Sequence, residues 1–262
     1  MLRFSKANAK TASLYNVPQI QPFLQGGRKV FSLDLLSGVN CPGAKDCHSW
    51  ATQDRKTGKW KIQDGRFTQF RCFSASQEAQ YPAVRALRKH NTDAIKGCGK
   101  SAAKITRLIL DSLPQKAGVV RYHVGGDFFS LPYMSAAVGV AAARGDILFY
   151  FYTKSLHILK DVVKDLPDAD LSVGHLLPNL RVTASYGGRF DNLIPELGVR
   201  IARVVYSEGE AESLGLGIDH DDSHAASEGG NFGLLIHGTQ PKGSEAAHAL
   251  VLLNGAGAYS RK

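Results

Sequence analysis

The chain of 262 residues lacks a long hydrophobic run. No stretch approaches the roughly 18–20 apolar residues that a membrane-spanning helix needs. The first residues, MLRFSKANAKTASLY, also lack the continuous apolar region and the small-residue cleavage site of a signal peptide. These absences predict a cytoplasmic protein and exclude one that is embedded in a membrane by apolar helices.

The familiar phosphate-binding loops and nucleic-acid modules are missing as well. Neither a G-x-G-x-x-G nor a G-x-x-x-x-G-K-[ST] pattern occurs, because GCGKSA at 97–102 lacks the first glycine of the second pattern. Helix-turn-helix and zinc-finger signatures are not recognisable either. A dinucleotide-binding fold and a P-loop ATPase are therefore disfavoured.

Acidic residues are scarce in the first part of the chain. Residues 1–110 contain 19 Lys and Arg against 6 Asp and Glu, whereas the remaining residues contain 13 against 17. Such asymmetry is typical of a protein with a nucleic acid or another acidic partner. A basic face that is merely solvated explains the same counts, and both interpretations stay open.

Cysteine is also scarce, and the four cysteines are confined to residues 41–98. In a reducing compartment, clustered cysteines more often bind metal or take part in catalysis than form disulfides. Structural zinc sites favour a C-x2–4-C knuckle. The spacing here, C-x5-C-x24-C-x25-C, contains no such knuckle. Independent buried thiols fit poorly with Cys41 and Cys47, which lie among Pro, Gly, Lys, Asp and His.

An iron–sulfur cluster explains the spacing better, because a cluster accepts thiolates from separate loops. Glycines beside the cysteines would expose backbone N–H groups to the sulfur atoms. We therefore predict a 4Fe-4S cluster bound by Cys41, Cys47 and Cys72. Cys98 is the candidate fourth ligand, and the alternatives are His48, His90 or an iron left open to a small molecule.

Strand and helix signals alternate regularly from residue 118 onward. Apolar strands are expected at 118–124, 146–153, 179–187 and 199–207, with a helix between each pair. Alternation at this spacing predicts an α/β fold with a parallel sheet. Together with a strand at 30–36, it favours a partial or complete (β/α) barrel with an irregular cysteine-bearing insertion after the first strand.

We expect a single domain over residues 1–262. A hairpin is expected at 54–67, and helices are expected at 75–95 and 101–113. The divisions along the chain are a loosely structured N-terminal arm at 1–28, the basic cysteine-bearing region at 29–110, the regular β/α units at 111–210 and a closing segment at 211–262.

Polar residues follow the apolar bodies of the predicted strands, at the end where α/β barrels build their sites. Alternation along a strand directs Arg121 and His123 into the lumen and places Asp127 at the strand's carboxyl end. The other residues expected to line this ligand pocket are Lys154, Glu208 and His237. Asp127 would hold a cationic amine and Lys154 an anion, unless each is engaged within the loops. The acidic loop DHDDSH at 219–224 is more typical of a solvated loop than of a metal site.

Three stretches carry a resemblance to a known family. The sequences CPGAKDC, RCFSASQEAQYPAVRALRKHN and VRYHVGGDFFSLPYMSAAVGVAAARGDILFYFYTKS resemble the gene product 88 family of bacteriophages and mobile elements, over roughly residues 6–160. A phage origin implies the cytoplasm of the host cell. The family is distantly similar to the radical S-adenosylmethionine (SAM) superfamily, in which the cluster cysteines follow the first strand of an α/β barrel. The Gly125–Asp127 turn is similar to the Gly-Gly-Glu turn that binds the amino group of SAM there.

The chain departs from the radical SAM pattern at three points. That pattern is C-x3-C-x2-C in one loop, whereas Cys72 lies far beyond Cys47, Asp127 stands where Glu is usual, and a fourth cysteine would block the iron that SAM chelates. Three functions follow. The first is an iron–sulfur protein whose cluster is structural, redox-active or small-molecule-binding. The others are a radical SAM-type enzyme with one open iron, and a zinc-stabilised nucleic-acid-binding phage protein.

Overall fold

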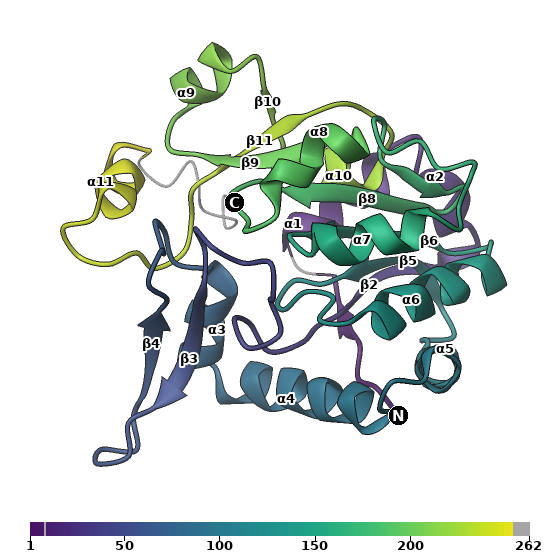
Figure 1. The fold of residues 1–262 in the computed structure, drawn as a ribbon, viewed down its shortest axis with the longest axis horizontal. Coiled ribbons are helices and arrows are strands. Elements are labelled where there is room, and N and C mark those ends of the chain that lie inside the picture. Colours follow the sequence, from purple (N-terminus) through teal and green to yellow (C-terminus); the bar gives the residue numbers. More distant parts are fainter. Residues whose placement is uncertain (8, 254–262) are drawn as a thin grey trace.

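The computed structural model describes residues 1–7 and 9–253, and its centre is a mainly parallel sheet (Figure 1). Within these residues the sheet has nine strands, and the order along its main path is β1-β2-β5-β6-β8-β9-β11-β10. The strands in this order are β1 (Ser5–Lys6), β2 (Lys29–Leu33), β5 (Ala117–Tyr122), β6 (Leu148–Thr153), β8 (Leu180–Ser185), β9 (Ile201–Val205), β11 (Phe232–Leu235) and β10 (Gly217–Ile218). The short β7 (His175–Leu177) is antiparallel to β8, and β1 is antiparallel to β2.

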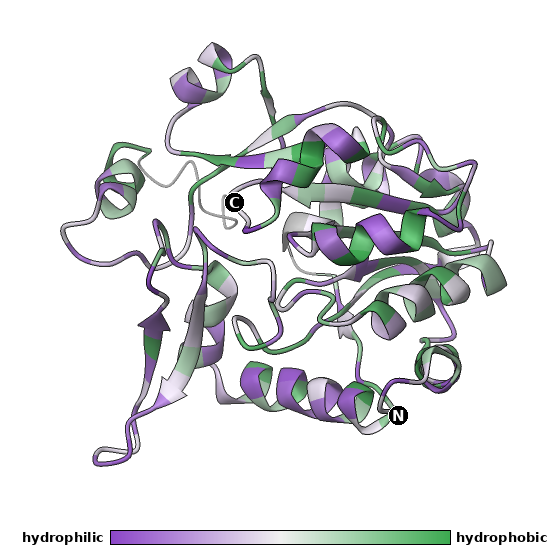
Figure 2. Cartoon of the chain, viewed as in Figure 1, coloured by the Kyte–Doolittle hydropathy of each residue, from purple (hydrophilic) through white to green (hydrophobic). Residues whose placement is uncertain are grey.

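Helices that follow the strands cover one face of this sheet. The elements concerned are α5 (Ala102–Ser112), α6 (Leu131–Ala143), α7 (Leu156–Val163), the 3-10 turn η3 (Asp191–Leu193) and α8 (Ile194–Leu197). Tyr122 and Phe149 of the sheet pack against this layer in one large buried cluster. Figure 2 shows that α6 is apolar along most of its length, as a helix buried on several sides requires. The predicted α/β alternation is therefore confirmed.

The opposite face of the sheet is covered by two segments that are distant in sequence. One is the N-terminal segment with α1 (Ala9–Ala12), η1 (Ser13–Asn16), α2 (Gln21–Leu24) and η2 (Gln25–Gly27), and the other is α10 (Ser223–Ala226). Leu14 and Ile20 are fully buried against Tyr150 of the sheet. Leu14, Ile20 and Leu24 are thus part of the core, in a segment that was expected to be a loosely structured arm.

The region between β2 and β5 forms a separate lobe beside the sheet. It contains a hairpin, with β3 (Ser49–Gln53) and β4 (Trp60–Asp64) forming a second sheet, followed by α3 (Phe73–Gln80) and α4 (Pro82–Gly97). A hairpin was expected at 54–67, and the first strand of the observed hairpin lies before that range. Pro82 begins α4 and separates the two helices where sequence periodicity suggested continuity. A buried ion pair between Arg88 and Glu78, at 3.0 Å, joins them.

The last part of the chain adds two helices at the edge of the molecule, α9 (Glu208–Ser213) and α11 (Glu245–Leu252). Among the described residues the hydrogen-bonded path of the main sheet ends at β1 and β10, so the structure shows an α/β sheet and not a closed ring. No helix in the described ranges has the length and apolarity to cross a membrane.

Candidate functional site

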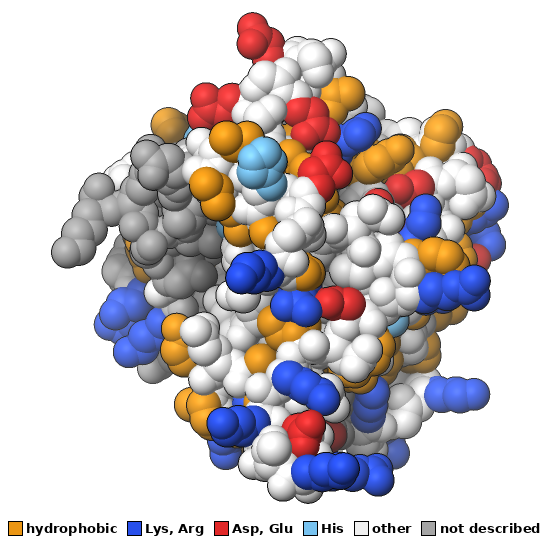
Figure 3. Space-filling view, turned by 90° about the vertical axis from the view of Figure 1, so that its left-hand side faces the viewer, with side chains coloured by type: hydrophobic (Ala, Val, Ile, Leu, Met, Phe, Trp, Pro, Cys, Tyr) orange, Lys and Arg blue, Asp and Glu red, His pale blue; other side chains and the backbone are white. Residues whose placement is uncertain are grey.

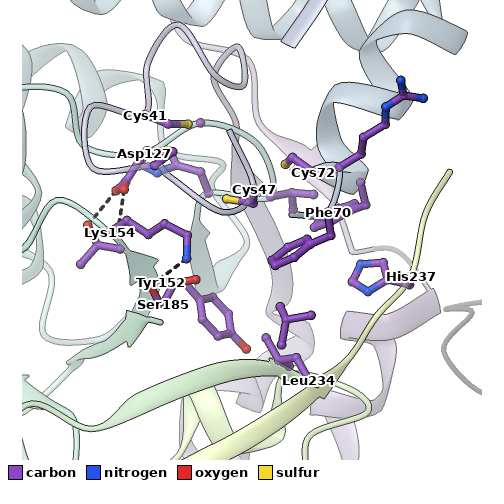
Figure 4. Close-up of a pocket in the computed structure, with 18 of the residues that line it drawn as sticks. Cys41, Cys47, Phe70, Cys72, Asp127, Tyr152, Lys154, Ser185, Leu234 and His237 are labelled. Atoms are coloured by element: carbon purple, nitrogen blue, oxygen red, sulfur yellow. Dashed lines mark hydrogen bonds between the residues drawn. The ribbon is translucent and has the colours of Figure 1, made fainter. Parts of the chain in front are cut away.

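A cavity of about 160 Å³ lies at the carboxyl ends of the parallel strands. Cys41, Cys47 and Cys72 line it together (Figure 4). Figure 4 shows the cysteines on one side of the cavity, with Tyr152, Ser185 and Leu234 across from them. Other residues that line the cavity are Phe70, Arg121, His123, Asp127, Lys154, Val204, Ile236 and His237.

The loop that carries Cys41 and Cys47 follows β2 and is held by backbone hydrogen bonds. The Cys41 amide donates to the Gly38 carbonyl at 3.1 Å, which forms a tight turn before the first cysteine. The Asp46 amide donates to the carbonyl of Gly187, in the segment after β8, at 3.0 Å. The loop therefore spans the strand ends from β2 to β8.

Gly43 lets this loop approach β6 closely. A Cβ atom at this position would lie 1.9 Å from the carbonyl oxygen of Lys154, a distance that no side chain tolerates. The chain after β6 and the cysteine loop thus touch through their backbones. Glycine is required here for close approach and not for an unusual φ angle.

Cys72 comes from a different segment and occupies the N-cap position of α3. Its backbone N–H donates to the hydroxyl of Ser49 at 2.9 Å, and Ser49 is buried at the start of β3. The position of Cys72 is therefore set by the hairpin as well as by the helix. The amides of Ser74 and Ala75 in the first turn of α3 favour a negative charge on its sulfur.

Burial raises the pKa of all three thiols. It raises the pKa of Cys72 to about 11, and it raises that of Cys41 well above the ordinary value, with further contributions from Asp127, Cys72 and Cys47. Burial also raises the pKa of Cys47, and the nearby ammonium of Lys154 opposes this. The three sulfurs thus lie close enough to repel one another when charged. They would become thiolates together only beside a compensating positive charge.

Within the ranges that the structure describes, no group of three or more His, Cys, Asp or Glu side chains is arranged to hold a metal ion. Zinc requires its ligands to converge to roughly 2.0–2.3 Å from one point. In an iron–sulfur cluster the cysteine thiolates bind different iron atoms, so their sulfurs are farther apart than the ligands of a single metal ion.

Cys98 does not lie with the other cysteines. It is the C-cap residue of α4, its thiol points to the Ala94 carbonyl at 3.6 Å, and it packs against the hydrophobic core. The Nε2 atom of His90 lies 2.9 Å from the carbonyl oxygen of Met1. His48 lines a hollow beside Cys41 on another side of the cysteine loop. The structure therefore brings together three of the four cysteines and places neither histidine in the cavity.

Asp127 lines the cavity, but its carboxylate is engaged by the protein. One oxygen accepts from the Phe128 amide at 2.7 Å and the Thr153 hydroxyl at 2.8 Å. The other accepts from the Lys154 amide at 2.9 Å and the Ser155 hydroxyl at 3.2 Å. Burial nevertheless raises the pKa of Asp127 to about 6. These bonds join the ends of β5 and β6 and leave no oxygen without a donor for a ligand amine.

The two glycines before Asp127 have separate causes. A Cβ at Gly125 would lie 2.2 Å from the Ser74 hydroxyl, so this glycine lets α3 approach the end of β5. Gly126 has a φ of +85° and lies against Leu35. The Gly-Gly-Asp turn is thus explained by packing and backbone conformation within the protein.

Lys154 is buried with its ammonium inside the protein. Its Nζ donates to the carbonyl oxygens of Ser185 at 2.8 Å and Tyr186 at 2.5 Å, at the end of β8. Its positive charge lies beside the sulfur of Cys47 and lowers the pKa of that thiol. Its position suits an anionic group, as the sequence suggested, although two of its protons are already used.

Arg121 faces the concave side of the sheet and forms an ion pair with Asp222. The hydroxyls of Tyr150 and Tyr152 donate to the same carboxylate, at 3.0 and 3.3 Å. Asp222 comes from the acidic loop that was expected to be solvated, and it is fully buried. The expectation that residues 219–224 form a solvated loop is therefore wrong for Asp222. The sequence did contain a signal for a buried carboxylate. Arg121, Tyr150 and Tyr152 are polar side chains on one face of adjacent buried strands, and they need an acceptor there.

His123 is the second polar residue at the end of β5. Its Nε2 atom lies 2.6 Å from the hydroxyl of Tyr133 in α6, and its ring contacts Phe128. Burial, together with the charge of Arg121, lowers the pKa of His123 to about 3. The imidazole is therefore neutral at physiological pH and is held by the helix layer, although it also borders the cavity.

The last two predicted pocket residues differ in position. His237, after β11, lines the cavity with its ring 4.7 Å from that of Phe73. Glu208 begins α9, is exposed, and does not line the cavity. Sequence reasoning missed the apolar wall formed by Phe70, Val204 and Leu234. Val204 and Leu234 lie in strands, where apolar residues are ordinarily assigned to the core, and Phe70 lies in the irregular segment before α3.

Comparison with known proteins gives one match. The family model described as gene product 88 matches residues 2–253. No curated protein matches the chain. No solved structure matches it either.

Proposed function

Since the chain belongs to the gene product 88 family, we propose that this member is an iron–sulfur protein whose 4Fe-4S cluster is bound by Cys41, Cys47 and Cys72. One observation carries the proposal. Three free thiols, from two segments separated by a hairpin, line a single cavity. Burial disfavours the charge of each thiolate, and the positive charge of the irons would compensate for it.

The sheet supports a radical-SAM-like (β/α) barrel as the scaffold. The parallel strands β2, β5, β6, β8, β9 and β11 are neighbours in the order in which the chain visits them. Such an order is that of a barrel, whereas a doubly wound sheet reverses its order at a switch point. The cysteine loop follows the first of these strands, and the cavity lies at their carboxyl ends, where barrels place their sites.

The position of Cys98 supports a cluster with one iron that no cysteine ligates. Across the cavity from the thiols lie Tyr152, Ser185 and Leu234, with the ammonium of Lys154 beside them. A small ligand with an anionic group would fit this space. SAM is the specific candidate, but its amino group would require acceptors other than the Asp127 carboxylate, whose two oxygens each accept two hydrogen bonds from the protein.

Metal analysis of anaerobically purified protein tests the cluster. We expect iron and acid-labile sulfide in equal amounts, about four of each per chain, and a brown protein. The variants Cys41→Ser, Cys47→Ser and Cys72→Ser should each lose most of the iron, whereas the matched variant Cys98→Ser should retain it. Colourless protein with stoichiometric zinc, or loss of iron only in Cys98→Ser, would overturn the proposal.

Electron paramagnetic resonance of the reduced cluster tests the open iron. SAM should change the spectrum of both the wild type and Cys98→Ser if it binds the iron that no cysteine ligates. An unchanged spectrum at saturating SAM, with the cluster fully loaded, would argue for a structural or electron-transferring cluster. Small anions such as azide or cyanide would then report separately whether the iron is accessible.

A further inference from the structure

The hairpin β3–β4 extends away from the main sheet and ends in a basic turn (Figure 1). The cations of this turn are Arg55, Lys56 and Lys59, and all three are exposed. None of the three forms an ion pair with another residue in the described part of the chain. Asp54, the acidic residue of the turn, pairs with Lys61 at 3.3 Å and accepts from the amides of Lys56 and Thr57. Its charge is therefore already compensated.

An aromatic residue with a fixed orientation stands directly beside this turn. Trp60 begins β4 and is 36% exposed, and the guanidinium of Arg85 lies 3.7 Å from the centre of its ring. Arg85 also donates to the backbone carbonyl of Glu78. Because the guanidinium is held at both ends, the indole keeps one orientation while part of it still meets solvent.

A second exposed aromatic lies one helical turn from the same arginine. Tyr81 connects α3 to α4 and is 53% exposed, and its carbonyl accepts from the Arg85 amide at 3.1 Å. Residues four apart lie on the same side of a helix. Arg55, Lys56, Lys59, Trp60, Tyr81 and Arg85 are called here the hairpin patch.

The charge around the hairpin patch is mainly positive. Figure 3 shows Lys and Arg side chains gathered on the lower half of this face, at the height of the hairpin and α4 in Figure 1. Asp and Glu side chains gather mainly on the upper half, at the height of α9. The excess of basic residues in the first part of the chain is thus displayed on a surface.

We propose that the hairpin patch binds single-stranded nucleic acid. Cations and exposed aromatic rings at intervals suit a strand whose phosphates meet Arg and Lys while its bases stack on the rings. A duplex hides its base faces, and an acidic protein segment offers a ring only where it carries an aromatic residue, whereas every nucleotide of a single strand offers one to Trp60 and Tyr81. This binding is independent of the cluster, because none of the six residues lines the cysteine cavity.

Tryptophan fluorescence provides a direct test, since the chain has only Trp50 and Trp60. In the full-length variant Trp50→Phe, emission comes from Trp60 alone. Titration with an oligothymidylate should quench it, and the logarithm of affinity should fall with the logarithm of salt by about 0.7 per phosphate contacted. A duplex of the same length should quench much less.

Two variants separate the hairpin patch from general charge. The triple variant Arg55→Ala, Lys56→Ala, Lys59→Ala should flatten the salt dependence by about 2 in slope, and Trp60→Ala should weaken binding at least about fivefold. The charge-matched control is Arg107→Ala, Lys160→Ala, Lys164→Ala, which alters exposed cations of α5 and α7. Failure to bind the oligonucleotide at low salt, equal binding of duplex, or equal loss in the control would each overturn the proposal. Oligonucleotide binding by cluster-free Cys72→Ser would confirm that the two proposals are separable.

Discussion

Two polar groups at the strand ends differ in how completely the protein satisfies them. Between the sheet and α10, the Asp222 carboxylate receives Arg121 and the hydroxyls of Tyr150 and Tyr152. Around the cavity, Cys41, Cys47 and Cys72 are half-buried, and desolvation opposes the charged forms of their thiols. A network whose partners all come from the chain stabilises the fold. For the three thiolates, the nearby cation is Lys154 beside Cys47, so a bound positive charge would stabilise the group further.

The largest expected effect comes from breaking the network around Asp222, which includes Arg121, Tyr150 and Tyr152. Asp222→Ala would leave the Arg121 guanidinium buried without its carboxylate, so we expect unfolding free energy to fall by about 3–5 kcal/mol. Urea unfolding of wild type and variant, both prepared without metal, measures this. Asp146→Ala is the control, since it breaks the surface pairs with Arg144 and Arg28 and should lose at most about 1 kcal/mol for each pair.

The same measurement on the cysteine group sharpens the comparison. Cys72→Ser in metal-free protein should lose much less than Asp222→Ala, because the partners of the thiol are the backbone amides of Ser74 and Ala75 and not a buried charge. Equal losses for the two variants would show that the thiols are structural, and the distinction between the two groups would fail.

The next effect concerns the contact that places the cysteine loop. Gly43→Ala forces a Cβ atom against the Lys154 carbonyl, and we expect about 3 kcal/mol of destabilisation with loss of bound iron. Gly97→Ala is the matched control, because nothing lies within 4 Å of a Cβ at that position. Its stability should stay at or slightly above that of the wild type, because alanine favours the helix. Normal iron content in Gly43→Ala would contradict the role assigned to this close approach.

Local patterns were sufficient to predict much of the scaffold. The strands β5, β6, β8 and β9, the helices α6 and α7, and the hairpin were all expected, because hydrophobic periodicity and turn residues act over a few neighbours. The direction of Arg121 into the concave side also followed from strand alternation. These features depend on contacts within one or two elements.

Features that depend on distant contacts escaped prediction. Asp222 lies 101 residues from Arg121, so its loop showed only a run of charge that usually faces solvent. The separation of Cys98 depends on the direction of α4, which the break at Pro82 and the buried pair of Arg88 with Glu78 determine. Asp127 was expected to bind a ligand amine. Three of its four donors are Thr153, Lys154 and Ser155, at and after the end of the next parallel strand, and the sequence did not show that they contact it.

The smallest predicted effect belongs to His123, which borders the cavity and lies beside Arg121. Its pKa is about 3 in the folded protein, whereas an unfolded histidine has a pKa near 6.5. Between these values the unfolded chain binds a proton that the native protein does not. Stability should therefore fall as pH decreases from about 6.5, by up to about 1.4 kcal/mol per pH unit.

The difference between wild type and His123→Gln isolates this contribution, because the carboxylates that also titrate in this range are common to both proteins. Unfolding free energies measured between pH 7.5 and 5 should converge as pH falls, since glutamine cannot take up the proton. Tyr133→Phe removes the hydroxyl beside Nε2 but leaves the ring buried, so the slope should persist in that variant. Parallel pH profiles for wild type and His123→Gln would mean that native His123 takes up its proton over the same pH range as in the unfolded chain. Below that range the network around Asp222 and the cavity would meet at a charged imidazolium, and the division between a satisfied group and an unsatisfied one would have to be redrawn.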